Sequence, residues 1–232
     1  MVYMEDPIWF SPFNVIFHFK IYKSDSAPKD PRQLKKTEEA FFVATMLVGI
    51  MAIQKKEYWM QIVSDKNGSP DIRTGNYKSP RGTPRNTWVT QEVEVVTFDE
   101  HSDEKSIPEF LRRTKLSKGK AYDPLTTILC YVRKDFHIPP LQTIVNDLQA
   151  DNCQSPIILL GKNSPDQETY KIAQINPQLD LVNEFDIPAD LPAEMKEKKY
   201  TGVLNLKKGS MPMFHSHPKE KHYPFEKIGI LL

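Results

Sequence analysis

The longest apolar segment of the chain, Ala40 to Ile53 (AFFVATMLVGIMAI), limits the architectures that the chain can adopt. Asp30 and Pro31 precede it, and this pair is typical of a helix start, because aspartate caps the first turn and proline fits the first helical position. We therefore expect a helix over about 31–55. A helix that is apolar on most faces must be covered by other elements, which indicates a layered domain. The apolar run is too short to span a bilayer, so we expect no membrane partner.

The remaining apolar segments are short and are separated by turn residues, as in a sheet with intervening helices. We predict helices over about 107–115, with Ser106 as the cap, and over 141–150. We predict strands over 14–22, 57–63, 71–74, 88–98, 125–134 and 155–162, and an edge strand over 168–175. This order favours an α/β fold with a central mixed sheet flanked by helices.

Composition fits one folded domain with an extension. The chain has 232 residues, of which 39% are hydrophobic, and it has 19 prolines but only 9 glycines. Its character changes near residue 186, where a proline-rich and charged segment begins, so we predict a domain over 1–185 and a C-terminal arm over 186–232 that serves as an interaction segment. The formal net charge of +1 excludes a global field for nucleic acid, so such a partner needs a local patch.

We expect the protein to be cytoplasmic. The N-terminal segment MVYMEDPIWF has early acids and no basic region of the kind that begins a secretory signal. The two cysteines, Cys130 and Cys153, have no C-x-x-C spacing, and we expect free thiols in a reducing compartment.

Three acids stand out in the middle of the chain. Glu92 and Glu94 are two apart on a predicted strand, so both side chains project from the same face. Two adjacent carboxylates on an apolar strand repel each other and lose hydration, and a bound cation offsets both costs. Asp71 stands at the head of the preceding strand and would approach the Glu92 end if the two strands pair. The three acids are candidates for a site that holds Mg²⁺ or Mn²⁺.

The pattern Pro70-Asp71 followed by Glu92-Val93-Glu94, after a long apolar helix and one strand, resembles the PD-(D/E)xK nuclease superfamily. By order of elements the resemblance covers about 32–160. It implies a restriction-endonuclease-like core and metal-dependent hydrolysis of DNA, in restriction or defence. It also implies that Asp71, Glu92 and the Val93 carbonyl bind the metal ion. Glu94 takes the place of the usual lysine and would orient or deprotonate water, and the first helix would add an acid, Glu38 or Glu39.

Basic residues flank this motif, as a phosphate-binding enzyme requires. The nearer group lies between the two acidic segments, and the second follows the predicted helix over 107–115. The nearer group comprises Arg73, Lys78, Arg81 and Arg85, and the second comprises Arg112, Arg113, Lys115, Lys118 and Lys120.

Plainer interpretations remain open. Glu92 and Glu94 would also suit the solvated face of a hairpin, and Glu38 and Glu39 would suit a first helical turn, where acids are favoured. The chain would then be a catalytically silent subunit of the same fold, or a structural protein that forms homo-oligomers or binds a partner subunit through its arm. The tail segment HSHP, with His215 and His217, resembles part of a JAMM metalloprotease motif but lacks the following Ser-x-x-Asp, so a surface loop is favoured.

Overall fold

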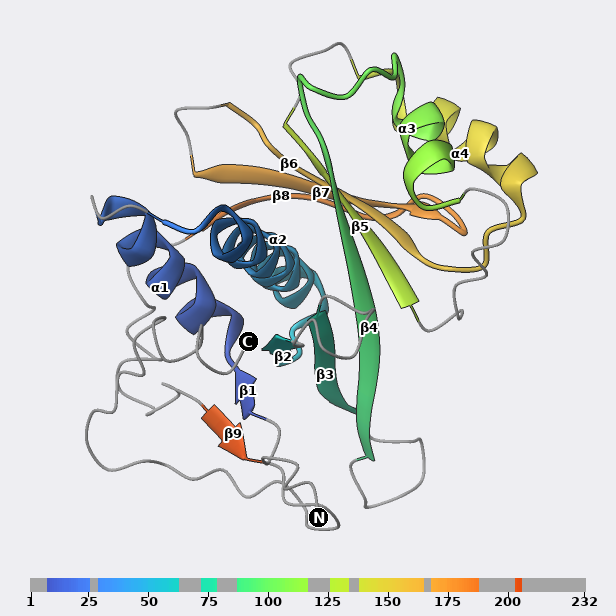
Figure 1. Ribbon diagram of the computed structural model, residues 1–232. Coiled ribbons are helices and arrows are strands. Elements are labelled where there is room, and N and C mark those ends of the chain that lie inside the picture. The colour runs from blue at the N-terminus through green and yellow to red at the C-terminus, as the bar shows by residue number, and fades with distance from the viewer. Residues whose placement is uncertain are drawn as a thin grey trace, which may run out of the picture. The chain divides into compact units, whose positions relative to one another are not determined.

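The computed structural model describes eight parts of the chain (Figure 1). The chain divides into two compact units. The described residues are 8–25, 29–62, 72–78, 87–116, 126–133, 138–164, 168–187 and 203–205. The first unit comprises Met1–Val48, Lys56–Thr90 and Pro188–Leu232, and the second comprises Gly49–Lys55 and Gln91–Ile187.

The described elements form a mixed α/β structure, as predicted. The helices are α1 (Pro12–Ser24), α2 (Pro31–Gln54), α3 (Ile107–Thr114) and α4 (Leu141–Leu148). The strands are β1 (Ile8–Phe10), β2 (Trp59–Ile62), β3 (Ile72–Lys78), β4 (Thr87–Phe98), β5 (Thr126–Val132), β6 (Ile157–Lys162), β7 (Thr169–Asn176), β8 (Asp180–Asp186) and β9 (Val203–Asn205). Their order in the sheet is β8-β7-β6-β5-β4-β3-β2-β1-β9. Strands β4, β5 and β6 are parallel, and β6–β7, β7–β8, β2–β3, β1–β2 and β1–β9 are antiparallel.

The core of the second unit lies between its strands and the pair α3 and α4, which lie together in Figure 1. Alternate residues of β4, β5 and β6 enter this core, including Phe98, Ile128 and Leu159, and the helices contribute Leu111 and Leu148 among others. Strands β5 and β6 are buried over nearly their whole length, as expected for parallel strands covered on both sides. This packing fixes which side chains of these strands face α3 and α4.

The end of α2 from Gly49 onward belongs to the second unit and packs against β8. A Cβ atom added to Gly49 would lie 2.5 Å from Cε1 of Phe185 on β8, which is closer than carbon atoms approach without moving. Phe185 stacks on Tyr170 of β7, with 6.1 Å between ring centroids. The absence of a side chain at Gly49 therefore lets the helix approach the sheet closely.

The prediction of a strand over 14–22 is wrong, because this segment forms helix α1. Pro12 suits the first helical position, and Val15, Ile16 and Phe19 are buried at a helical spacing. Phe19 stacks on Phe41 of α2, with 4.3 Å between ring centroids. Packing against α2 thus decides the conformation of a segment whose side chains also suit a strand.

Helix α2 begins as the sequence predicts. The Asp30 carboxylate accepts a 2.9 Å hydrogen bond from the backbone N–H of Arg32 and so caps the first turn. The helix is long and apolar enough to meet the length and composition of a membrane span, but 67% of that stretch is buried inside the protein. The burial is that of a core helix.

Two buried threonines on α2 differ in their hydrogen bonding, so the same substitution should have opposite effects on stability at the two positions. Thr37 Oγ1 donates to the Gln33 carbonyl at 2.7 Å, whereas Thr45 Oγ1 is buried without a partner among the described residues. We expect Thr45→Val to raise the free energy of unfolding by about 1 kcal/mol, because a buried hydroxyl without a bond costs energy. Thr37→Val should lower it by about 1 kcal/mol, because it removes a bond.

Urea denaturation of the two variants and the wild type measures both effects. Both substitutions keep a β-branched side chain on the same helix, so helix propensity cancels in the comparison. Equal destabilisation by both variants would contradict the prediction.

The segments at the ends of the sheet depart from the sequence predictions. Strand β7 was expected at the edge, but β8 pairs with its outer side. Strand β3 extends beyond the predicted end at residue 74, because Gly75 pairs with Trp59 of β2. In the C-terminal segment, β9 pairs with β1, while residues 188–202 and 206–232 lie outside the described part of the chain. The division at 185/186 and the interaction role of the arm stay predictions.

Both cysteines are free thiols, as predicted. Cys130 is fully buried on β5, and burial raises the pKa of its thiol to about 12. Cys153 is half-buried, and burial also raises the pKa of its thiol. Both thiols are therefore protonated and unreactive at neutral pH.

Candidate active site around Glu94

The two acids of β4 lie on the face of the strand that α3 and α4 cover. Val96 and Phe98 mark this face, because both pack in the core beneath the two helices, and Glu92 and Glu94 share their alternation. In the parallel register Glu92 lies opposite Thr126 and Glu94 opposite Ile128 of β5. The acids thus lie where the apolar core gives way to polar residues.

Glu94 is buried and forms an ion pair with Lys115, the residue that ends α3. Lys115 Nζ lies 2.6 Å from Glu94 Oε2, and the two side chains are only 13% and 8% exposed. The other carboxylate oxygen, Oε1, is buried and has no hydrogen-bond partner among the described residues. Glu94 therefore does not lie on a solvated hairpin face, whereas Glu92 is half-buried.

An orphaned buried carboxylate oxygen fits a cation or a hydrogen-bond donor, since either would satisfy it. The predicted ligand set is not assembled within the described residues, where no group of three or more His, Cys, Asp or Glu side chains could hold a metal ion. Asp71 lies outside the described residues, so the set of Asp71, Glu92 and the Val93 carbonyl stays a prediction. Glu92 and Glu94 alone supply carboxylates of the kind that Mg²⁺ and Mn²⁺ prefer.

The acid predicted from the first helix belongs to the first unit. Glu39 lies on α2, its side chain is 14% exposed, and it forms an i,i+4 ion pair with Lys35 at 3.7 Å. Pairs of this kind are common on helices and contribute little. Its role as a metal ligand stays a prediction.

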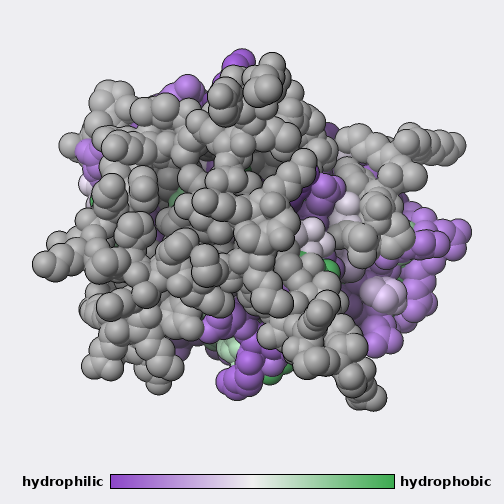
Figure 2. Space-filling view, turned by 90° about the horizontal axis from the view of Figure 1, so that it is seen from below, coloured by the Kyte–Doolittle hydropathy of each residue, from purple (hydrophilic) through white to green (hydrophobic). Residues whose placement is uncertain are grey.

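The residues predicted to contact nucleic acid are described only in part. Arg73 is exposed on β3. Lys78 ends the same strand, but its side chain lies outside what the structure describes, as do Arg81 and Arg85. On the face shown in Figure 2 the part of the surface that belongs to described residues is mainly hydrophilic. Four large hydrophobic side chains among the described residues are exposed. They are Ile21, Ile53, Ile138 and Val182.

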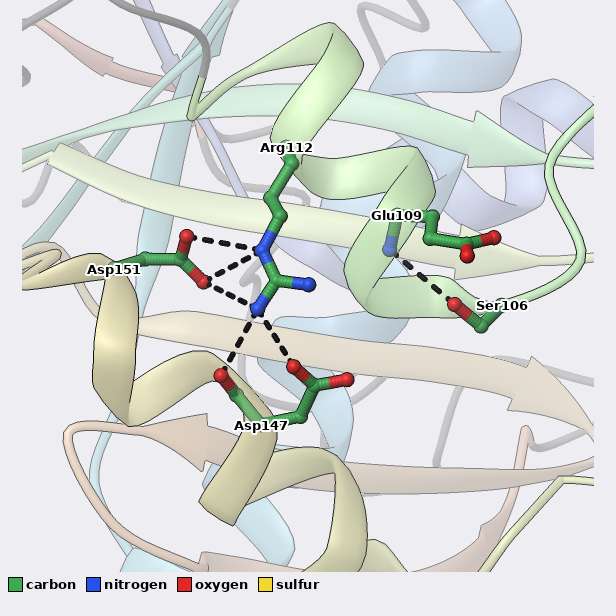
Figure 3. Close-up of polar contacts among 5 residues, drawn as sticks. All are labelled: Ser106, Glu109, Arg112, Asp147 and Asp151. Atoms are coloured by element: carbon green, nitrogen blue, oxygen red, sulfur yellow. Dashed lines mark hydrogen bonds and ion pairs between the residues drawn. The ribbon is translucent and has the colours of Figure 1, made fainter.

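The second basic group does not form an open cationic surface in its described members. Arg112, Arg113 and Lys115 each form an ion pair with a carboxylate, and Lys118 and Lys120 lie outside the described residues. In Figure 3 the Arg112 guanidinium lies between Asp147 and Asp151, and the Ser106 hydroxyl accepts the Glu109 N–H as the predicted cap. These cations are therefore engaged with acids of the same unit.

Arg112 links α3 to the end of α4 through a fork of contacts. Its Nε donates to both Asp151 oxygens at 2.9 and 3.0 Å. One terminal nitrogen donates to the Asp147 carbonyl and carboxylate at 2.9 and 2.7 Å. The hydrogen bonds to Asp151 and then to Asp147 raise the pKa of Arg112. A lysine has no planar fork and cannot make this set of contacts.

We therefore expect Arg112→Lys to lower the free energy of unfolding by about 1–2 kcal/mol, because hydrogen bonds to charged groups are lost while partial exposure limits the effect. Arg113→Lys is the control, because the one acid that Arg113 pairs with among the described residues is Glu104 and its side chain is 59% exposed, so its change should stay within about 0.5 kcal/mol. Urea denaturation measures both. A similar loss of stability in the two variants would show that the hydrogen bonds of Arg112 to Asp147 and Asp151 add nothing to the free energy of unfolding.

Lys115 is the member of the site that the sequence motif does not single out. It lies four residues after the buried Leu111, so it shares the apolar face of α3 that packs on the sheet. The sequence feature that could have indicated Lys115 is a cation at that helical spacing.

The chain was compared with known protein families, curated proteins and solved structures, and none of them matches it.

Proposed function

We propose that the chain is a metal-dependent endonuclease that hydrolyses phosphodiester bonds in DNA, built on a restriction-endonuclease-like core. The observation that carries the proposal is Glu94, a buried carboxylate on β4 with one oxygen that has no partner among the described residues, two residues from Glu92 on the same face. The order α2, β2, β3, β4, α3, β5 supports it, because it is the order of elements that the motif implies.

In this proposal Asp71, Glu92 and the Val93 carbonyl hold Mg²⁺ or Mn²⁺, and Glu39 is a further candidate ligand. A metal ion bound there would supply a nucleophilic water at neutral pH and would stabilise the leaving oxygen. Glu94 Oε1 accepts a hydrogen bond from the attacking water and orients it. Arg73, Lys78, Arg81 and Arg85 bind the DNA phosphates and fix the position of the backbone.

The test is cleavage of supercoiled plasmid and linear duplex DNA in Mg²⁺, Mn²⁺ and EDTA. We expect the wild type to cut with either metal ion and not in EDTA, and Asp71→Ala and Glu92→Ala to lose the activity while keeping their fold. Glu100→Gln is the control, because Glu100 is an exposed acid in the turn after β4. Cutting that survives both alanine variants would place the activity elsewhere.

A second candidate function is that of a catalytically silent subunit of the same fold, which forms homo-oligomers or binds a partner through its C-terminal arm. The Lys115–Glu94 pair favours it, because the ammonium already balances the charge of an acid in the motif. The described cations of the second basic group are likewise paired with acids. The absence of cutting on every nucleic acid, with a stable assembly that persists after Asp71→Ala and Glu92→Ala, would support this candidate.

A further inference from the structure

Strand β8 forms one end of the sheet, and its outer edge pairs with no other strand among the described residues. The Ile187 N–H donates to the Glu168 carbonyl at 3.0 Å, which identifies the residues that bond to β7. Bonded and non-bonded residues alternate in an antiparallel pair, so the N–H and C=O groups of Glu184 and Asp186 point away from β7. Within the described part of the chain, these backbone groups lie at an open edge.

The open edge of β8 has few of the features that usually protect such an edge, which are proline, lysine and bulges. The strand, DLVNEFD, contains neither proline nor lysine. Its one irregularity lies near its start, where the pairing with β7 shifts between Ile172 and Gln174 and Leu181 has a φ of 51°. The following residues, from Asn183 to Asp186, pair in regular register and therefore suit the addition of a further strand.

The charged side chains of β8 are all acids. Glu184 is 49% exposed and lies 3.5 Å from Lys171, which is itself 59% exposed, and a surface pair of this kind contributes little. Asp186 is exposed and pairs with no cation among the described residues. Neutral groups also contact the two acids, since the Thr169 hydroxyl donates to Asp186 at 2.6 Å and the Asn163 amide donates to Glu184 at 3.3 Å. The edge therefore keeps acidic character that a cation can still approach.

This acidity decides which kind of strand fits the edge. A second copy of β8 has no cation of its own, so antiparallel pairing of two copies brings Glu184 and Asp186 of one close to the same acids of the other. Like charges on directly opposite residues destabilise a sheet, whereas opposite charges stabilise it. A segment with lysine or arginine at alternate positions is complementary to this edge.

We propose that the outer edge of β8 is a docking site for an extended, basic segment of a partner protein, which adds to the sheet as a strand. Backbone hydrogen bonds to Glu184 and Asp186 supply the affinity, and the basic side chains lie beside the two carboxylates. Val182, which is 60% exposed near the start of the same edge, contacts an apolar residue of the segment. The surface belongs to the second unit, and its use is independent of the proposed endonuclease activity.

The test uses a fluorescein-labelled peptide of alternating lysine and valine, whose binding to the full-length protein is followed by fluorescence anisotropy. One control peptide has the same residues with its central amides N-methylated, so it keeps the charge but cannot donate those backbone hydrogen bonds. A second control peptide has glutamate in place of lysine. Glu184→Pro removes the outward N–H of β8, and Glu184→Gln is its match, because it removes the same charge and keeps the N–H.

We expect the lysine–valine peptide to bind the wild type, and to bind Glu184→Pro about tenfold more weakly than Glu184→Gln, because the proline removes a donor and obstructs the edge. Neither control peptide should bind. Circular dichroism checks the fold of the variants, and if Glu184→Pro does not fold, the N-methylated peptide tests the same hydrogen bonds on the wild type.

Three results would overturn the proposal of a basic strand at this edge. The first is no binding of the lysine–valine peptide. The second is equal binding of this peptide and its N-methylated form, or of the folded proline and glutamine variants, because charge alone would then account for it. The third is a wild-type dimer in sedimentation velocity that Glu184→Pro dissociates, because a second copy would then occupy the edge.

Discussion

Lys115→Met should lower the free energy of unfolding in EDTA by about 3–5 kcal/mol, among the largest effects expected of a single substitution in the described residues. The reason is that Glu94 would remain buried with its charge uncompensated, and its second oxygen has no partner in the part of the chain that the structure describes. Unfolding in urea, followed by circular dichroism, measures the change. Urea is preferred to guanidinium because a salt would screen the charges under test.

The double variant Glu94→Gln/Lys115→Met is the control for this effect. It removes both charges and nearly keeps both shapes, and replacement of a buried pair by neutral residues is often close to neutral. We expect it to recover most of the stability that the single variant loses. A double variant as unstable as Lys115→Met would show that packing of the lysine stem, and not the ion pair, accounts for the loss.

The elements that could be predicted from the sequence are those whose pattern suits a single structure. Helix α2 has an apolar run too long for a strand and a cap at Asp30, and the buried strands β5 and β6 are bounded by turn residues. Helix α3 has its cap at Ser106. In these segments local propensity and burial agree, so no distant contact is needed to decide between structures.

The elements that were missed depend on partners far away in the sequence. The residues of α1 suit a strand by their aromatic and β-branched content, and the contact between Phe19 and Phe41 of α2 settles the conformation. Strand β8 is polar, and most of its residues are exposed or half-buried. Its pairing with β7 follows from the position of that strand, which no local pattern of β8 reports.

The candidate site shows the same division between local and distant information. Spacing alone places Glu92 and Glu94 on one face of β4, but the same spacing suits a solvated strand and a buried one. Burial of Glu94 depends on the cover that β5 and α3 provide. The partner in the ion pair, Lys115, comes from the helix that follows the strand, so no motif confined to β4 contains it.

Asn176→Asp should destabilise the protein by about 3 kcal/mol or more at neutral pH. The Asn176 side chain is buried at the end of β7, and its Nδ2 donates to the carbonyls of Cys153 and Ser155 at 2.8 and 2.7 Å. These bonds hold the turn that leads into β6. An ionised aspartate has the same shape but cannot donate, so its charge would lie against two carbonyl oxygens in a buried place.

The loss should depend on pH with a definite sign. Burial beside two acceptors disfavours the charged form, so the pKa of the new carboxyl rises in the folded state above its ordinary value of about 3.9. The protonated carboxyl can donate one hydrogen bond. The variant is therefore closest to the wild type below that value, and it loses stability as pH rises through the raised pKa of the folded state.

Urea unfolding of Asn176→Asp and the wild type at several pH values, expressed as a difference, isolates this group because the other titrations cancel. Asn176→Ala is the matched control. It also removes both hydrogen bonds, but it adds no titrating group, so its difference from the wild type should not change with pH. The difference in free energy of unfolding between Asn176→Asp and the wild type could also prove independent of pH. In that case the two carbonyls do not act on residue 176 as the geometry requires, and the turn is held by its own backbone.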